Sequence, residues 1–551
     1  MATTGILRSR RSAAQLHALT SVEREIRAND PAVGRKYLRD FRDAYRSYEG
    51  VRSAEQVRAA ISRAGVVLVG DYHALPNSQR YLASLIRDAE VGGRPLVLGV
   101  ETVFSRDQHI LEEWWRGEID ESELRQRIRF DLDWGYDWSP FYELLSAARE
   151  HAEAIYGLDC MPREDLRKIG ARDRHAADKI AGMRAAHPEA LILALFGESH
   201  LAPKHLPALL RERLPEERVV TVLQNVDALY WRAAGEATDR VEAVEAGEDV
   251  FCVFNATPLE KYENYRLCLD RWGRDGDGAP DFGPTVYNLV DGLVRLLGIN
   301  RYSDHNTTQP RLLVDLMPEV YSRSSDSLLR RLLSRKGFTA GLRRALLRRV
   351  KERGSVYLPQ LNAVYVRQFQ MMSAAEEAAR FLHHACRGLP NRINGRVPEP
   401  LAPEDAFYAA VLENAIGYFG SRVLYPARPA FRDPDLHELY DLTREDLELQ
   451  TALPFRDAVE AIDFLALHRK SGRIGGRLET PPEWQTRAFA FSGRKHEYVT
   501  EQLGYLAGND LYDAYLEGRL TPAGLRKLFL AHIEEPGVAR ETYFHLNTRL
   551  R

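Results

Sequence analysis

A series of short apolar runs, separated by segments with helical spacing, constrains the fold of this chain more than any other feature. Val and Leu dominate the runs, which is typical of strands buried on both faces of a parallel sheet. The runs are VVLVG at 66–70, PLVLGVE at 95–101, AIYGLD at 154–159, LILALFG at 191–197 and RVVTVLQN at 218–225, with DVFCVFN at 249–255 as a candidate sixth. Because helical segments connect them, we predict an α/β fold with a mostly parallel sheet flanked by helices.

The length of 551 residues suggests two or three domains. The stretch GRDGDGAPDFGP at 273–284 is rich in Gly, Asp and Pro and is typical of a linker. Beyond it the pattern is mainly helical. We therefore expect a helical N-terminal lead over residues 1–60, the α/β domain over 61–272, the linker over 273–284, and a mainly α-helical C-terminal domain over 285–551.

Composition and charge exclude several classes of protein. The chain is 44% hydrophobic and 28% charged with a net charge of −3, which fits a soluble globular protein that has no general affinity for polyanions. The four cysteines form no CxxC pair, so neither a zinc knuckle nor a disulfide framework is indicated. The first 25 residues contain no signal-peptide-like apolar stretch, and no window is apolar enough to span a membrane. We expect a cytoplasmic protein.

Polar residues follow the predicted strands, at the edge where parallel sheets bind ligands. Gly70 and His73 frame a Gly-x-x-His motif after the first strand, and Gly197 and His200 frame another after the fourth. The second strand ends at Glu101 and the third at Asp159, as read from the end of the apolar runs. Glycine permits a sharp turn and a close approach to the backbone, so the histidines can point over the sheet edge. We predict one shared polar site.

Three kinds of chemistry are open to such a site. His73, Glu101 and His200 could hold a divalent metal ion of unknown identity. The same side chains could act as general acid and base without a metal. A His or Tyr placed there could instead ligate haem iron.

At these residues the sequence resembles the ChaN-like haem-binding-uptake family, in a superfamily with the Tiki and TraB proteins and the erythromycin esterases. The matching pieces, over residues 60–260, are VVLVGDYH, VLGVET, WGYDWSPFYELLSAARE, the helix start at Ala171–Arg174, and LFGESHLAPKHLP. The resemblance implies that His73, Glu101, Arg172 and His200 carry the site. Tiki-like and esterase-like members use such residues for metal-dependent or metal-free hydrolysis. ChaN binds haem at the outer membrane as a lipoprotein.

This sequence departs from ChaN in having no recognisable signal peptide or lipid-anchor cysteine, and in carrying about 270 further residues after the α/β domain. Both departures argue against haem uptake at the outer membrane.

Several residues have candidate roles of their own. Arg172 could clamp a carboxylate or phosphate through its planar fork. Tyr72 and Tyr136 are the phenols best placed to reach haem iron, and Trp134 could wall the pocket for a planar ligand. We also expect Ser139 to cap a helix that begins at Pro140.

The C-terminal half carries weaker signals. Residues 321–353 contain short basic amphipathic helices, which suggest a weak contact with an anionic surface and no specific nucleic-acid site. The helix EEAARFLHHACRG places Glu376 and His383, and Glu377 and His384, two turns apart, and we interpret it as an ordinary helix.

The first function hypothesis is a metal-dependent hydrolase of esterase or peptidase type, acting on a small-molecule or peptide substrate through His73, Glu101 and His200. The alternative is a non-catalytic haem- or porphyrin-binding protein. A third hypothesis is an interaction protein that acts through its helical C-terminal half.

Overall fold

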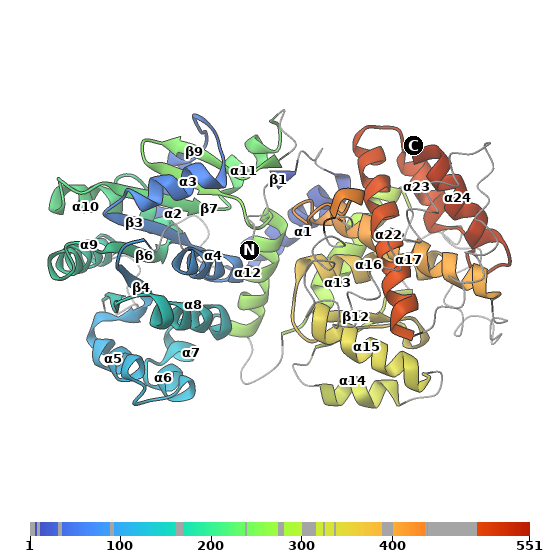
Figure 1. The fold of residues 1–551 in the computed structure, drawn as a ribbon, viewed down its shortest axis with the longest axis horizontal. Helices are drawn as coiled ribbons and strands as arrows, with labels where there is room; N and C mark the ends of the chain where they lie inside the picture. The colour runs from blue at the N-terminus through green and yellow to red at the C-terminus, as the bar shows by residue number, and fades with distance from the viewer. Residues whose placement is uncertain are drawn as a thin grey trace. The chain divides into compact units, whose positions relative to one another are not determined.

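The computed structural model forms two compact units (Figure 1). One unit comprises Met1–Arg10 and Val22–Gly276, and the other comprises Arg11–Ser21 and Asp277–Arg551. The structure describes residues 6–7, 12–30, 36–88, 93–160, 169–236, 240–273, 280–299, 316–322, 326–334, 338–387, 401–435, 438 and 493–550.

An eight-stranded sheet forms the centre of the first unit, in the order β2-β9-β10-β7-β3-β6-β4-β5. The strands from β10 to β5 are parallel, whereas β9 and β2 are antiparallel additions at one edge. Their bounds are β2 Gly50–Arg52, β3 Val66–Asp71, β4 Leu96–Phe104, β5 Ala154–Asp159, β6 Leu191–Gly197, β7 Val219–Gln224, β9 Ala243–Gly247 and β10 Val250–Val253. The predicted α/β fold class is confirmed.

Helices cover both faces of this sheet. Along β3 and β6 successive side chains enter two separate apolar clusters, because neighbouring residues of a strand point to opposite faces. One cluster includes α3 (Ala54–Ser62), α4 (Pro76–Arg87), α5 (Gln108–Arg116), α6 (Glu121–Arg127) and α8 (Trp138–His151). The other includes α2 (Lys36–Ala44), α9 (Ile169–Ala186), α10 (Leu206–Arg213) and α11 (Asp227–Ala233). Burial on both faces explains why the strand runs are continuously apolar.

Three sequence expectations need correction. Strand β4 continues past Glu101 to Phe104, although its pairing with β6 ends at Val100. Helix α8 begins at Trp138 and not at Pro140, because the side chain of Asp137 caps it by accepting from the Ser139 N–H at 3.2 Å. Residues 1–60 are not a separate helical lead, since β2 pairs with β9 and part of α1 (Ala13–Asn29) clusters with the second unit.

The second unit is mainly helical, as expected, but it also contains a small sheet that the sequence reading missed. Its strands are β11 Glu319–Ser322, β12 Ser355–Leu358 and β13 Ala363–Val366, in the order β11-β13-β12. Its helices are α13 Gly283–Leu297, α14 Asp326–Leu333, α15 Ala340–Arg353, α16 Met371–Arg387, α17 Pro403–Leu424, α22 Gly493–Leu516, α23 Pro522–Phe529 and α24 Val538–Leu550. No helix among the described residues is long and apolar enough to cross a membrane.

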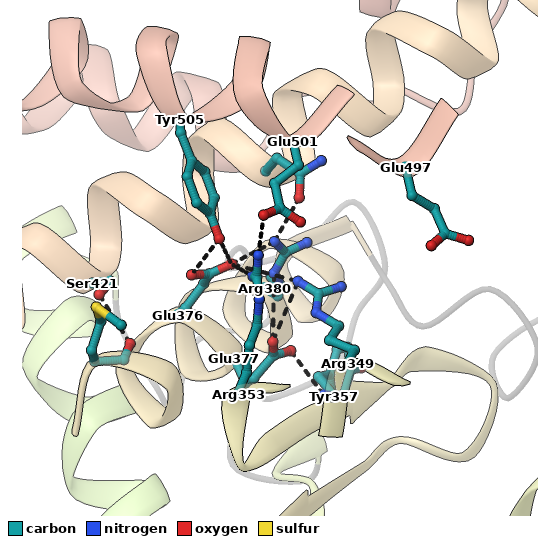
Figure 2. A network of polar contacts seen from close by, with 12 residues as sticks. Arg349, Arg353, Tyr357, Glu376, Glu377, Arg380, Ser421, Glu497, Glu501 and Tyr505 are labelled. Atoms are coloured by element: carbon teal, nitrogen blue, oxygen red, sulfur yellow. Dashed lines mark hydrogen bonds and ion pairs between the residues drawn. The ribbon is translucent and has the colours of Figure 1, made fainter. Parts of the chain in front are cut away.

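A buried ionic network links four segments of the second unit (Figure 2). Glu376 on α16 is 3% exposed and contacts Arg353 at 3.0 Å, Arg380 at 2.7 Å and Arg428 at 2.8 Å. The Tyr505 hydroxyl on α22 lies 3.3 Å from both oxygens of the same carboxylate. Helix α16, which the sequence predicted as an ordinary helix, buries charged groups along much of its length.

Candidate functional site

Strand order brings the predicted site residues together. Strand β6 lies between β3 and β4, so the residues that follow these three strands meet at one edge of the sheet. The two histidines approach Glu101 from either side: His73 Nε2 lies 3.6 Å from Oε2, and His200 Nε2 lies 3.8 Å from Oε1. The chain thus assembles His73, Glu101 and His200 as one cluster.

Gly197 makes this close assembly possible. A Cβ at this position would lie 3.1 Å from Glu101 Oε2 and 3.4 Å from both His73 Nε2 and His200 Cδ2. The Gly197 N–H donates to Glu101 Oε2 at 2.5 Å. Glycine is therefore favoured here by the limited space and not by an unusual backbone angle, because a Cβ would force a neighbouring side chain to shift.

His73 is held by the carboxylate of Asp71, the last residue of β3. Its Nδ1 lies 2.6 Å from Asp71 Oδ2, and Gln79 donates to the other carboxylate oxygen. Burial raises the pKa of Asp71, while the adjacent His73 opposes that rise. The His73 side chain is 14% exposed, so it is the more accessible of the two histidines. Its Nε2 is left facing Glu101.

His200 has a similar partner but is more deeply buried, with a side chain 4% exposed. Its Nδ1 lies 2.5 Å from Asp173 Oδ1, on α9. The second oxygen of Asp173 lies 3.2 Å from Nδ1 of His205, whose Nε2 is 3.6 Å from Asp40. Asp173 thus orients two imidazoles, and a carboxylate on Nδ1 directs the opposite nitrogen of His200 toward Glu101.

Glu101 is a buried anion with its oxygens already engaged. Arg172 NH2 lies 2.5 Å from Oε1, opposite the Gly197 contact. Burial alone would raise the pKa of Glu101, but His73, Arg172 and His200 lower it to about 2. Glu101 is therefore ionised near neutral pH.

Arg172 is also committed to the protein itself. Its guanidinium makes two bonds to Asp159, at 2.9 Å and 2.8 Å, besides the one to Glu101. Burial disfavours its charge, yet Glu101 and Asp159 raise the pKa of Arg172. The sequence suggested that Arg172 binds a carboxylate or phosphate of a substrate, whereas in the structure its guanidinium binds two carboxylates of the protein. These contacts fix Glu101 and Asp159 relative to each other.

The expected divalent metal site is not supported. Within the described ranges, no group of three or more His, Cys, Asp or Glu side chains is arranged to hold a metal ion. At Glu101 the charge of the carboxylate is already balanced by the guanidinium of Arg172, which lies 2.5 Å from Oε1.

Aromatic side chains surround His73. Its ring lies 5.3 Å, centroid to centroid, from both Trp134 and Tyr136. Tyr72 has a different environment, since the Lys261 ammonium lies 4.5 Å from its ring centroid. Burial raises the pKa of Tyr72 well above 10, which disfavours the phenolate that iron ligation would need. Of the two predicted tyrosines, Tyr136 is the one that contacts His73.

Sequence reading did not assign roles to several residues of this site. Asp71 stands inside the VVLVGDYH match and Asp173 follows Arg172, so both were visible as neighbours of predicted residues. Glu198 likewise stands inside the LFGESHLAPKHLP match, whereas Lys261 carried no such signal. The Lys261 Nζ lies 3.1 Å from Glu198 Oε1, and both side chains lie at the same strand edge. Their pairing depends on the placement of α12 (Pro258–Trp272), which local sequence does not reveal.

The fold and the two Asp–His pairs around a buried glutamate define a parallel α/β domain with a strand-end acid–base cluster. Residues 57–200 match the family model described as "Haem-binding uptake, Tiki superfamily, ChaN". The predicted resemblance is thereby confirmed.

Two solved structures are similar to parts of the chain. "Cofacial heme binding to ChaN of Campylobacter jejuni" is 16% identical, covers 32% of this chain and 86% of that chain, and has a TM-score of 0.24. "The structure of the type III effector HopBA1" is 15% identical, covers 38% of this chain and 97% of that chain, and has a TM-score of 0.26. No curated protein matches this chain.

Proposed function

We propose that the α/β domain is a hydrolase that cleaves an ester by acid–base catalysis without a metal ion. The observation that carries this proposal is the Asp71–His73 pair, in which a carboxylate lies 2.6 Å from Nδ1 of a partly exposed imidazole whose Nε2 faces Glu101. A carboxylate bound to Nδ1–H fixes the tautomer that a general base needs.

In the proposed reaction, His73 Nε2 takes a proton from water while the water oxygen attacks the ester carbonyl carbon. The tetrahedral intermediate then expels the alcohol oxygen as the carbon–oxygen bond breaks. The imidazolium returns its proton to that oxygen. Glu101 faces Nε2 at 3.6 Å and, being ionised, favours the imidazolium.

Hydrolysis of 4-nitrophenyl acetate with and without EDTA tests this proposal. We expect turnover that EDTA does not abolish, and a loss of about 10²–10⁴-fold in kcat for His73→Ala and Asp71→Asn. His109→Ala is the matched control, because His109 is an exposed histidine of the same unit. Turnover that EDTA abolishes and Zn²⁺ restores would revive the metal-dependent mechanism. Equal activity in His73→Ala and the control would refute the role of His73.

Haem binding is the second candidate, favoured by the family match over residues 57–200 and by the aromatic rings of Trp134 and Tyr136 beside His73. His73 Nε2 would be the iron ligand and the two rings would contact the porphyrin. We expect a Soret band when haemin is added to the full chain, and its loss in His73→Ala. A Soret band that survives this substitution would place haem elsewhere.

A further inference from the structure

Helix α12 presents one face toward the candidate site, although it lies beyond the family-matched segment. Lys261, Tyr265 and Trp272 are spaced by four and seven residues, which places them along one side of a helix. Lys261 and Tyr265 both contact Tyr72, the neighbour of His73, with Tyr265 at 6.0 Å between ring centroids. This face thus reaches the residues around His73.

A continuous row of rings leads from the end of α12 to His73. Trp272 lies 6.2 Å from Tyr265 and 5.2 Å from Tyr136 between ring centroids. Tyr136 in turn lies 5.3 Å from His73. Trp272 is 43% exposed, which is unusual for so large an apolar side chain.

The position of Trp272 is fixed by the loop that carries Tyr136. Its indole N–H donates to the Gly135 carbonyl at 3.0 Å. Gly135 has a φ of +68°, and a Cβ there would lie 2.7 Å from the indole nitrogen. Both the backbone angle and the space therefore require glycine, so the exposed indole is held in place and is not a loosely placed surface side chain.

From this geometry we infer that Trp272, with Tyr265 and Tyr136, forms a platform that selects esters carrying an aromatic group in the acyl part, beside the carbonyl carbon that is attacked. Aromatic rings favour edge-to-face and offset contacts with a further ring, and a partly exposed indole retains surface for such a contact. The inference rests on the proposed hydrolase function, and it assigns the substrate class to residues of α12.

The test compares 4-nitrophenyl phenylacetate with 4-nitrophenyl acetate, which share a leaving group and differ by one phenyl ring. We expect the wild-type kcat/KM to favour the phenylacetyl ester about tenfold, and Trp272→Ala to lower kcat/KM for the phenylacetyl ester until this preference is lost. Trp272→Phe should restore most of the preference. Trp231→Ala on α11 is the control for loss of a half-buried indole elsewhere in the unit.

Calorimetric binding of phenylacetamide and acetamide separates this inference from the proposed function. If neither ester is hydrolysed but phenylacetamide binds in a Trp272-dependent manner, the platform stands and the hydrolase proposal fails. If both esters react equally in wild type and Trp272→Ala, the platform is refuted while the hydrolase stands. If Trp272→Ala weakens haemin binding and leaves the hydrolysis of both esters unaffected, the assignment of the platform to esters with an aromatic acyl group is overturned.

Discussion

The two Gly-x-x-His histidines have the same local sequence pattern but different surroundings. His73 is partly exposed, contacts two aromatic rings and pairs with Asp71 from its own strand end. His200 is buried and pairs with Asp173 from a helix, which also holds His205. Substrate access therefore favours His73 as the reacting group. His200 is better suited to a supporting role, in which its buried imidazole helps to stabilise the negative charge of Glu101.

The depressed pKa of Glu101 predicts a specific pH dependence of stability. A carboxyl group whose folded pKa lies below its unfolded value, here about 2 against 4.5, stabilises the fold above pH 4.5 and loses this contribution as the pH falls toward 2. We expect the difference in unfolding free energy between wild type and Glu101→Gln to shrink over this window. Urea unfolding followed by tryptophan fluorescence measures it. A difference that stays constant between pH 5 and 2.5 would contradict the prediction.

Residue identity alone predicted the members of the site better than their roles. The sequence predicted that His73, Glu101, Arg172 and His200 lie together, and the structure brings the other three side chains within 4 Å of Glu101. The metal-binding role of His73, Glu101 and His200 and the clamp role of Arg172 depended on which side-chain atoms already had partners within the protein. Only the three-dimensional structure shows that Arg172 and the Gly197 N–H occupy both oxygens of Glu101.

At the scale of elements, the end of β6 is the most sensitive part of the site. Gly197→Ala would place a methyl group 3.1 Å from Glu101 Oε2 and 3.4 Å from His73 Nε2, so one of these side chains must move. We expect esterase activity or haemin binding to fall at least tenfold while the far-UV circular dichroism spectrum is unchanged. Gly182→Ala is the matched control, because a Cβ there meets nothing within 4 Å.

Gly182 lies within α9, so its replacement by alanine should raise the unfolding free energy by roughly 0.5–1 kcal/mol. Equal activities of the two alanine variants would show that Gly197 is not constrained by the site.

The core strands of the large sheet were predictable because continuous apolar runs report burial on both faces. The antiparallel strands β2 and β9 were not, since both are mostly half-buried and short. Strands β12 and β13 in the second unit are fully buried, but each has four residues, which is too short for periodicity to separate a strand from a helical turn.

At the scale of the whole molecule, composition does not reveal which charged side chains are exposed and which are paired within the fold. Arg348, Arg349 and Arg353 belong to the basic stretch 321–353, yet they pair with glutamates of α16 and α22. Arg343 and Arg344 remain exposed on α15. The predicted contact with an anionic surface therefore rests on fewer exposed basic residues than the sequence suggested. A cytoplasmic location also remains a prediction.

The Glu376 network predicts where the second unit is most vulnerable. Glu376→Gln removes the anion that Arg353 and Arg380 share (Figure 2). The same anion pairs with the buried Arg428 at 2.8 Å, so the substitution removes one carboxylate partner from each of three arginines. We expect a loss of roughly 3–5 kcal/mol in the unfolding free energy of this unit. Hydrogen exchange should show α16 losing protection while β3 and β6 keep theirs.

The exposed pair of Glu517 and Arg519 provides the control for this experiment. Glu517→Gln should change stability by less than about 1 kcal/mol. Equal effects of the two substitutions on α16 would mean that the buried network contributes no more than a surface pair.

The position of β6 has a consequence for how the protein acquires its site. Strands β3 and β4 follow each other in the chain, but they are separated in the sheet by β6, which begins about 90 residues after β4 ends. A chain emerging from the ribosome therefore holds His73 and Glu101 long before the segment that brings them together has been synthesised. Such non-local insertion is slow relative to local pairing. The site consequently forms in a single late step. Incomplete chains that lack β6 should contain His73 and Glu101 but should not bring them together into a functional site.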